Sequence, residues 1–526
     1  MTTPSGPSSD ALPDPVADEE FDELLSRHRS RPHAPSPSAQ APEPWDGTTF
    51  LERFPRPVPR RGTPPAPRPD ASRVPGVAEL LAGYADGALD PVTVVEEVLA
   101  AVGPDGPAPT AFLAECAGAR EAAADSARRW AGGRARPLEG VPFGVKDIVD
   151  VAGTPVTCGS LLTGDRVAAT DAVVVARLRA AGAVPVVMTA TTEFACGLAL
   201  NARYGAVQNP WRAGRWTGGS STGSGAAVAA RVVPFALGTD TGGSVRVPSS
   251  LCGISGLKPT YGLLPRDGVS ALSWTLDHVG PMARSALDLA LVLAVLADAP
   301  VQVCADLQGV RVGRVRGWFE QRCDAGVVAA TDETVRVLRA HGAEVVDVDL
   351  PGAARAYDDG LVVLSAELAA TQEGNADRAG LFDGGTRKRL GRGARVSAAD
   401  YLRALRGRAL AQRELLDVMD RADVDVLLTP GVGTTAPHLD DLTADVDDER
   451  VPLQEIVPRN TSPFNVTGFP ALVVPAGTGR DDLPVAVQLV ARPYAEDLLL
   501  GVGAGLQAVT DHHLAAPAGR GATVPA

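Results

Sequence analysis

The sequence predicts an α/β fold with one large, twisted, mixed and mostly parallel central sheet that helices cover on both faces. A helical pattern over residues 171–181 is followed by an apolar strand over 184–188. The alternation recurs as a strand over 310–315, a helix over 327–341 and a strand over 344–348. Strands that alternate with helices pair in parallel, because each helix carries the chain back across the sheet. With 526 residues, 45% of them hydrophobic, the chain can bury a large core.

The first elements lead to a lysine at the end of an apolar strand. Helical spacing begins near Val77, and a second helix is expected over 115–130. A strand over 141–145 then ends at Lys146. An exposed lysine, with a pKa of about 10, is a poor base at neutral pH. A buried lysine loses its proton more readily, because low dielectric penalises the cation. The strand alone leaves both interpretations open.

The most informative stretch covers residues 216–262. It contains two Gly-Gly-Ser turns, at 218–220 and 242–244, separated by a small-residue helix over 225–231 and an apolar strand over 232–237. Glycines beside a serine leave backbone N–H groups open, which suits an oxyanion hole. No Gly-Lys-Ser/Thr follows either turn, which disfavours a phosphate-binding loop. The expected oxyanion donors are the N–H groups of Thr241, Gly242, Gly243 and Ser244.

The second half of the chain continues the alternation of helices and strands. Its final part is expected to close the sheet and to cover it with one more helix. The predicted elements are helices over 287–296 and 398–421, a strand over 424–429, an acidic loop over 431–460, strands at 473–474 and 485–490, and a helix over 495–509.

The stretch at 216–262 resembles the amidase signature family, serine hydrolases with a Ser–cis-Ser–Lys triad. The match consists of GGSS, GTDTGGSVR, PSS, CG and GLKPTYG, in this order, and it extends over about 77–514. One departure is Thr222, where the family usually has glycine. Other matching segments are LEGVPFGVKD at 138–147, EFA at 193–195, NPW at 209–211, LDHVGP at 276–281, LTP at 428–430 and QLV at 488–490.

The resemblance implies the amidase-signature form of the α/β fold and a set of roles. Ser244 is then the nucleophile, Ser220 the bridging serine after a cis peptide at Gly219–Ser220, and Lys146 the base. The reaction implied is hydrolysis of a carboxylic amide to a carboxylate and ammonia or an amine, through an acyl-Ser244 intermediate. Neither a cofactor nor a metal is expected. The supporting residues are Ser221, which is expected to hydrogen-bond to the relay, and Asp240 and Arg246, which orient the loop.

Three alternative functions are left open. Residues 219–223 match G-x-S-x-G, which would make Ser221 the nucleophile of an α/β-hydrolase, with His278 as the best histidine candidate. A second alternative is the glutamine-hydrolysing subunit of a tRNA-dependent amidotransferase. The Pro-rich leader and the segment 455–463, which does not resemble that branch's glutamine-recognising segment, argue against it. The third is a non-catalytic binding protein, although all three triad positions are filled.

Composition limits the partners and the location. The net charge of −14 disfavours nucleic acid and anionic membranes, because phosphate contacts need clustered Lys and Arg. The longest apolar run, 287–296, is too short to span a bilayer, and no signal peptide follows Met1. Six cysteines without a C-x-x-C pair indicate a reduced, cytoplasmic protein. We therefore expect a small-molecule amide as partner, no nucleic acid and no membrane, with a homodimer as an option.

The chain is expected to divide into a leader over 1–75, a catalytic domain over 76–514 and a small-residue tail over 515–526. Seventeen of the 44 prolines lie in the leader, which predicts disorder apart from a helix-compatible patch at 19–27. The rival interpretation is a tail that wraps around the domain or a partner through Trp45, Phe50 and Phe54. The substrate pocket is expected to draw on segments outside the triad motif, namely 196–204, Trp274, 317–323, 367–382 and 431–460.

Overall fold

The structure is a computed structural model that describes residues 18–31, 54–60, 62, 64–66, 74–103, 105–446 and 449–517. Within these residues no helix is both long and apolar enough to cross a membrane. The six cysteines are buried and free. The described part of the chain places no cluster of three or more His, Cys, Asp or Glu side chains where they could hold a metal ion.

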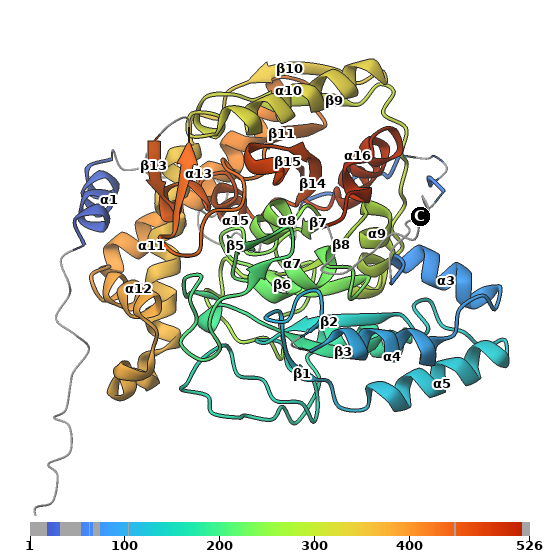
Figure 1. The fold of residues 1–526 in the computed structure, drawn as a ribbon. Helices are drawn as coiled ribbons and strands as arrows, with labels where there is room; N and C mark the ends of the chain where they lie inside the picture. The colour runs from blue at the N-terminus through green and yellow to red at the C-terminus, as the bar shows by residue number, and fades with distance from the viewer. Residues whose placement is uncertain are drawn as a thin grey trace, which may run out of the picture.

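One eleven-stranded mixed sheet runs through the molecule in the order β1-β3-β2-β6-β8-β7-β14-β15-β11-β9-β10 (Figure 1). Two parallel sections, β3-β2-β6 and β11-β9-β10, are joined by antiparallel strands in the middle. The predicted α/β class with one large mixed sheet is therefore confirmed. The strands are β1 Phe112–Glu115, β2 Pro142–Lys146, β3 Val184–Thr189, β6 Phe235–Asp240, β7 Ser255–Lys258, β8 His278–Ala283, β9 Arg311–Val315, β10 Glu344–Val348, β11 Val426–Pro430, β14 Ala471–Thr478 and β15 Pro484–Ala491.

Helices pack on the sheet, and a second group of helices stands beside it (Figure 1). The helices around the sheet are α3 Val77–Ala85, α4 Pro91–Ala101, α5 Ala119–Ala131, α6 Val173–Ala180, α7 Thr222–Ala229, α8 Arg246–Cys252, α9 Ala286–Leu296, α10 Ala325–Ala340 and α16 Glu496–Val509. The second group comprises α11 Ala353–Thr371, α12 Gly384–Ala394, α13 Ala398–Arg421 and α15 Ser462–Thr467. Two short ribbons complete the fold, namely β4 Gln208–Asn209 with β5 Arg212–Trp216, and β12 Thr443–Val446 with β13 Glu449–Pro452.

Helix α7 lies close to the sheet because its side chains are small. All eight of its residues are buried. A Cβ atom added at Gly223 would lie 2.3 Å from the backbone nitrogen of Ala190, so this position has no room for a side chain. The departure at Thr222 fits the same contact, since its hydroxyl donates to the carbonyl of Ala190 over 3.0 Å. This close contact places the first turn of α7 beside Ala190, the residue that directly follows β3.

The leader contains one docked helix, α1 Glu19–Ser30. Asp18 caps it by accepting from the N–H of Phe21 over 3.2 Å. Phe21, Leu24 and Leu25 are buried in a cluster to which α11 and α13 contribute. A helix here agrees with the helix-compatible patch expected at 19–27, whereas its docking against α11 and α13 was not predicted. The rival interpretation, a tail that wraps through Trp45, Phe50 and Phe54, falls mostly outside the described residues. Amphipathic spacing on a patch this short does not reveal which surface receives it. Most of the remaining leader, and the tail beyond 517, fall outside the described residues.

Candidate active site

Lys146 ends β2 in one of the parallel sections of the sheet and is fully buried. Its Nζ donates to Ser220 Oγ over 2.7 Å and to Thr239 Oγ1 over 2.8 Å. Burial lowers the pKa of Lys146 to about 7, against the opposing effect of the negative charges of Asp240 and Asp277. A lysine with that pKa is neutral in a large fraction of molecules at neutral pH and can accept a proton.

Ser220 stands between β5 and α7, and the peptide bond Gly219–Ser220 is cis, as the resemblance implies. The next residue has a different environment. Ser221 is fully buried, and its Oγ lies 3.3 Å from both the N–H and the carbonyl oxygen of Thr239. Ser221 is therefore linked to Lys146 indirectly. It contacts the backbone of Thr239, and the hydroxyl of Thr239 is the second hydrogen-bond partner of Lys146 Nζ.

Ser244 lies in the turn that joins β6 to α8. The backbone N–H of Ser221 donates to the carbonyl of Ser244 over 3.3 Å, which holds the two Gly-Gly-Ser turns side by side. Ser220 and Ser244 line one cavity of about 180 Å³, together with the backbone of 241–243. The structure thus brings all three predicted triad residues to one place from three separate segments.

The predicted oxyanion donors differ in availability. The N–H of Gly243 donates to Asp240 Oδ1 over 2.8 Å, so it is already engaged, which corrects the expectation for this residue. The N–H groups of Thr241, Gly242 and Ser244 donate to no acceptor among the described residues. The hydroxyl of Thr461 donates to the carbonyl of Gly242 over 2.6 Å and fixes this peptide unit. Thr241, Gly242 and Ser244 are therefore better candidates for binding an oxyanion than Gly243.

A buried ion pair holds the turn around Ser244. Arg246 Nη2 and Nε lie 2.9 and 3.0 Å from the two carboxylate oxygens of Asp240, and neither side chain is exposed. The remaining guanidinium donors reach the carbonyl of Thr461 and the side chains of Asn465 and Gln488. Burial alone would raise the pKa of Asp240, but the charge of Arg246 and the hydrogen bonds from Arg246 and Asn465 hold it well below its usual range.

The sequence analysis missed several residues of this network. Thr239 stands within the GTDTGG motif, yet the motif alone does not show that its hydroxyl meets Lys146. Thr461 and Asn465 come from a segment more than 200 residues away, and no local pattern marks them. Asp277 accepts from Thr241 Oγ1 over 2.6 Å, and burial raises its pKa to about 6. The contact between Thr241 and Asp277 depends on the pairing of β6 with β8, which local sequence patterns do not predict.

His278 has a structural environment. It is buried on β8, where Nδ1 lies 2.7 Å from the carbonyl of Leu276 and Nε2 lies 3.2 Å from Lys258 Nζ. Burial and the neighbouring Lys258 hold its pKa well below the usual value. These contacts fit a neutral imidazole that donates from Nδ1 and accepts at Nε2. Since Ser221 also lies off the cavity wall, the geometry disfavours the α/β-hydrolase alternative.

The cavity wall agrees with the expected segments only in part. Segments 196–204 and 431–460 contribute to it, whereas Trp274, 317–323 and 367–382 do not. Trp274 borders a neighbouring cavity, which shares Ala195 and Leu272 with the one beside Ser244. The wall also includes residues that the sequence analysis did not predict. They lie on helices, and a helical pattern does not show which face borders a cavity. They are Tyr357, Leu361 and Leu364 on α11, Arg389 and Arg392 on α12, and Glu20 on α1.

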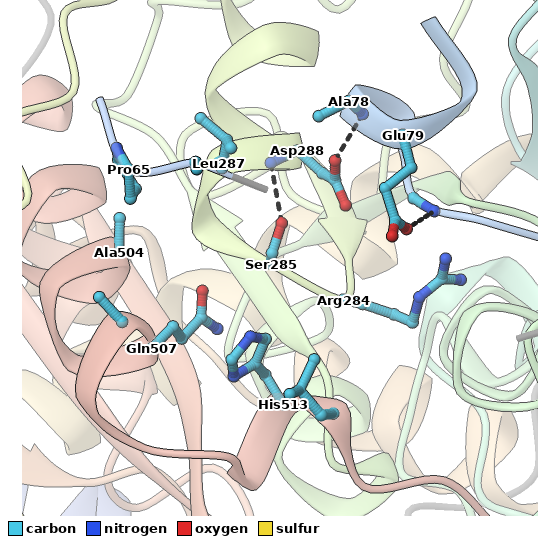
Figure 2. A pocket seen from close by; sticks show the side chains of 14 residues that line it. Pro65, Ala78, Glu79, Arg284, Ser285, Leu287, Asp288, Ala504, Gln507 and His513 are labelled. Atoms are coloured by element: carbon cyan, nitrogen blue, oxygen red, sulfur yellow. Dashed lines mark hydrogen bonds between the residues drawn. The ribbon is translucent and has the colours of Figure 1, made fainter. Parts of the chain in front are cut away.

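Another cavity, of about 360 Å³, shares no lining residue with the one beside Ser244 (Figure 2). Its polar groups join helices to one another. The carboxylate of Asp288 accepts from the N–H of Ala78 over 3.0 Å, and Ser285 caps α9 through the N–H of Asp288. Figure 2 shows these contacts where α3 meets α9. The chemistry suggested by the triad motif therefore belongs to the cavity beside Ser244.

Comparison with known proteins agrees with this geometry. A family model described as Amidase matches residues 107–500, which include Lys146, Ser220 and Ser244. A glutamyl-tRNA(Gln) amidotransferase subunit from Chloroflexus aggregans is 38% identical over 476 residues, covering 82% of this chain and 96% of that protein. The protein of the same name from Roseiflexus castenholzii is 35% identical and covers 84% and 97%. Peptide amidase from Stenotrophomonas maltophilia has a TM-score of 0.71 and 28% identity, with 83% and 96% covered.

The ion pair leads to a stability prediction. Replacing Arg246 by Met keeps the volume but leaves the Asp240 carboxylate buried without its partner, which typically costs about 3–5 kcal/mol. We expect a loss of this size in the free energy of unfolding, measured with urea at pH 7. The loss should shrink as the pH falls, beginning above the ordinary carboxyl pKa of about 4, because burial without Arg246 raises the pKa of Asp240 and the carboxylate takes up a proton.

The matched control for this measurement is Arg336→Met, which breaks an exposed pair with Glu333 and should change the free energy of unfolding far less. Equal losses in the two variants would show that the buried pair does not hold the turn.

Proposed function

Since this chain belongs to the amidase family, we propose that it hydrolyses the C–N bond of a carboxylic amide through an acyl intermediate on Ser244. The observation that carries the proposal is the contact of Lys146 with Ser220. A fully buried lysine, whose pKa burial lowers to about 7, lies 2.7 Å from a serine that shares a cavity with Ser244. An exposed lysine elsewhere on the surface would be protonated and could not act as a base.

The relay works through neutral Lys146. Its free amine accepts the proton of Ser220, and Ser220 accepts the proton of Ser244 as the Ser244 oxygen attacks the amide carbonyl. Thr239 Oγ1, 2.8 Å from Lys146 Nζ, keeps the amine aligned and, as a neutral hydroxyl, does not favour the ammonium form as a carboxylate would. Relay and nucleophile are thus coupled through uncharged groups until the reaction begins.

The negative charge on the carbonyl oxygen is stabilised by the N–H groups of Thr241 and Gly242, which the Asp240–Arg246 pair and Thr461 hold in place. The proton then passes back to the nitrogen of the substrate, so the C–N bond breaks and ammonia or an amine leaves. A water molecule, deprotonated by the same relay, attacks the acyl group and releases the carboxylate. These steps draw only on groups of this chain, the substrate and water.

The cavity indicates the size of the substrate. At about 180 Å³ it is smaller than the roughly 300–1,000 Å³ typical of sites for drug-sized ligands. A small linear amide fits that space better than a large one.

A second candidate follows from the relatives named as glutamyl-tRNA(Gln) amidotransferase subunits. On this hypothesis the chain releases ammonia from glutamine within a complex of several proteins. A panel of alkyl, aryl, aminoacyl and carbamoyl amides, with glutamine included, separates the candidates. Turnover of small amides by the chain alone supports the amidase. Turnover of glutamine only, and only with partner proteins present, supports the amidotransferase role.

Ser244→Ala should remove amide hydrolysis, by about three orders of magnitude or more, since loss of a nucleophile removes the acyl intermediate. Ser220→Ala should also fall far below the native enzyme. His278→Asn, if folded, should keep most of kcat, because His278 contacts Lys258 and backbone carbonyls rather than a serine of the relay.

Steady-state kinetics, circular dichroism and labelling with a serine-reactive phosphonate check this set. Labelling at Ser221, or an inactive His278→Asn beside an active Ser220→Ala, would remove the proposed relay.

The pH profile tests Lys146 directly. The pKa of Lys146 is lowered to about 7, so its neutral form increases as the pH rises through 7, and kcat/KM should rise with it. Lys146→Arg should be inactive at every pH, because a guanidinium keeps its proton. Lys388→Arg, at an exposed site, provides the control and should leave the profile unchanged. A Lys146→Arg variant with native turnover would contradict the role of base.

A further inference from the structure

Helix α1 reaches the wall of the cavity that contains Ser244. Glu20, on its first turn, lines this cavity, although it lies more than 200 residues before the serine. The neighbouring wall is formed by α11 and α12, through side chains that include Tyr357, Arg389 and Arg392. In Figure 1, α1 stands at the side of the molecule that α11 and α12 occupy. A segment of the leader is thus part of the candidate active site.

The apolar face of α1 is docked firmly enough to act as a wall. Phe21, Leu24 and Leu25 are each no more than 4% exposed. His28, also buried, places Nδ1 3.1 Å from Asp359 Oδ1 on α11 and Nε2 3.1 Å from the carbonyl of Asp400 on α13. Burying three large apolar side chains removes their surface from water, which favours the docked helix.

Ion pairs at both ends of α1 fix its register. At the first turn, Asp18 Oδ2 lies 2.6 Å from Arg392 Nε, and Glu20 Oε2 lies 3.1 Å from Arg392 Nη2. At the last turn, Arg29 Nη2 lies 2.7 Å from Asp400 Oδ2, while Arg31 Nη2 is 2.5 Å from Asp358 Oδ2. Opposite charges at the two ends prevent the helix from sliding or reversing.

These contacts change the charge of the cavity wall. Arg389 and Arg392 both line the cavity from α12. Arg389 donates to the carbonyl of Cys196 and has no carboxylate partner among the described residues. Within the same residues, Arg392 is paired only with Asp18 and Glu20, both of which belong to the leader. Asp18 also lies 3.7 Å from Lys388 Nζ. With α1 docked, two carboxylates of the leader pair with Arg392, whereas without α1 this guanidinium lines the cavity without them.

We propose that α1 is a substrate-selecting element of the enzyme, which completes the outer wall of the cavity and neutralises Arg392 so that uncharged amides are favoured over amides that carry a carboxylate. The proposal rests on the proposed function, because it assigns the cavity beside Ser244 to the substrate. Asp18 and Glu20 are specificity residues in this scheme and take no part in proton transfer.

The test compares two variants of the full chain that carry the same change of charge. Asp18→Asn with Glu20→Gln removes both partners of Arg392, and asparagine still caps the helix. Asp22→Asn with Glu23→Gln is the control, since neither residue lines the cavity and Asp22 pairs with Arg395 instead. Two phosphonates, one with an alkyl tail and one with the same tail ending in a carboxylate, are reacted with Ser244, and the ratio of their labelling rates is measured.

We expect the ratio to shift toward the carboxylate probe by about fivefold or more in Asp18→Asn with Glu20→Gln, and to stay unchanged in the control. The ratio of kcat/KM for succinamate over butyramide should shift in the same way. A shift of equal size in the control, or no shift in either variant, would overturn the proposal. Absence of labelling at Ser244 in the native chain would instead overturn the proposed function.

Removal of the whole wall provides a second measurement. Phe21→Ser with Leu24→Ser undocks α1 without adding charge, and circular dichroism verifies that the remainder is folded. This variant should show the same shift toward the carboxylate probe and should also accept bulkier phosphonates than the native chain. Native selectivity for both charge and size in this variant would show that α1 does not form the wall.

Discussion

The Asp240–Arg246 pair is the contact on which the arrangement of the site depends. Buried away from water, each charge needs the other, and so the turn between them can take only one shape. The carboxylate also accepts from the backbone of 243, 245 and 246, which shapes the peptide units around Ser244. The guanidinium reaches Thr461, Asn465 and Gln488, so the turn is fixed to the far end of the chain.

The same pair bears on the base. Lys146 is buried because it ends a strand inside the sheet, and that burial lowers its pKa. The negative charge of Asp240 favours the ammonium form, but this carboxylate is paired with Arg246, and the hydrogen-bond partners of Lys146 Nζ are the hydroxyls of Ser220 and Thr239. The carboxylate that shapes the turn is thus paired with Arg246, while the amine of Lys146, which transfers protons in the proposed relay, hydrogen-bonds to hydroxyl groups.

Local sequence patterns were enough to predict the family and the large mixed sheet, and they singled out Lys146, Ser220 and Ser244, because each has a signature within a few residues. The family match over 107–500 bears out the first of these. Contacts between distant segments carry no such signature. Thr461 beside Gly242 and α1 against α11 are examples. The engagement of the Gly243 N–H by Asp240 was missed for a different reason, since a glycine-rich turn shows that donors exist but not which of them are already bonded.

The position of Glu20 on the cavity wall has a thermodynamic consequence. If docked α1 favours an uncharged ligand, then by reciprocity that ligand makes α1 dock more tightly. The leader and the cavity are therefore coupled equilibria rather than separate parts. A ligand bound beside Ser244 therefore changes how tightly the N-terminal helix is docked. The protection of this helix from proteases or from hydrogen exchange then reports whether the site is filled.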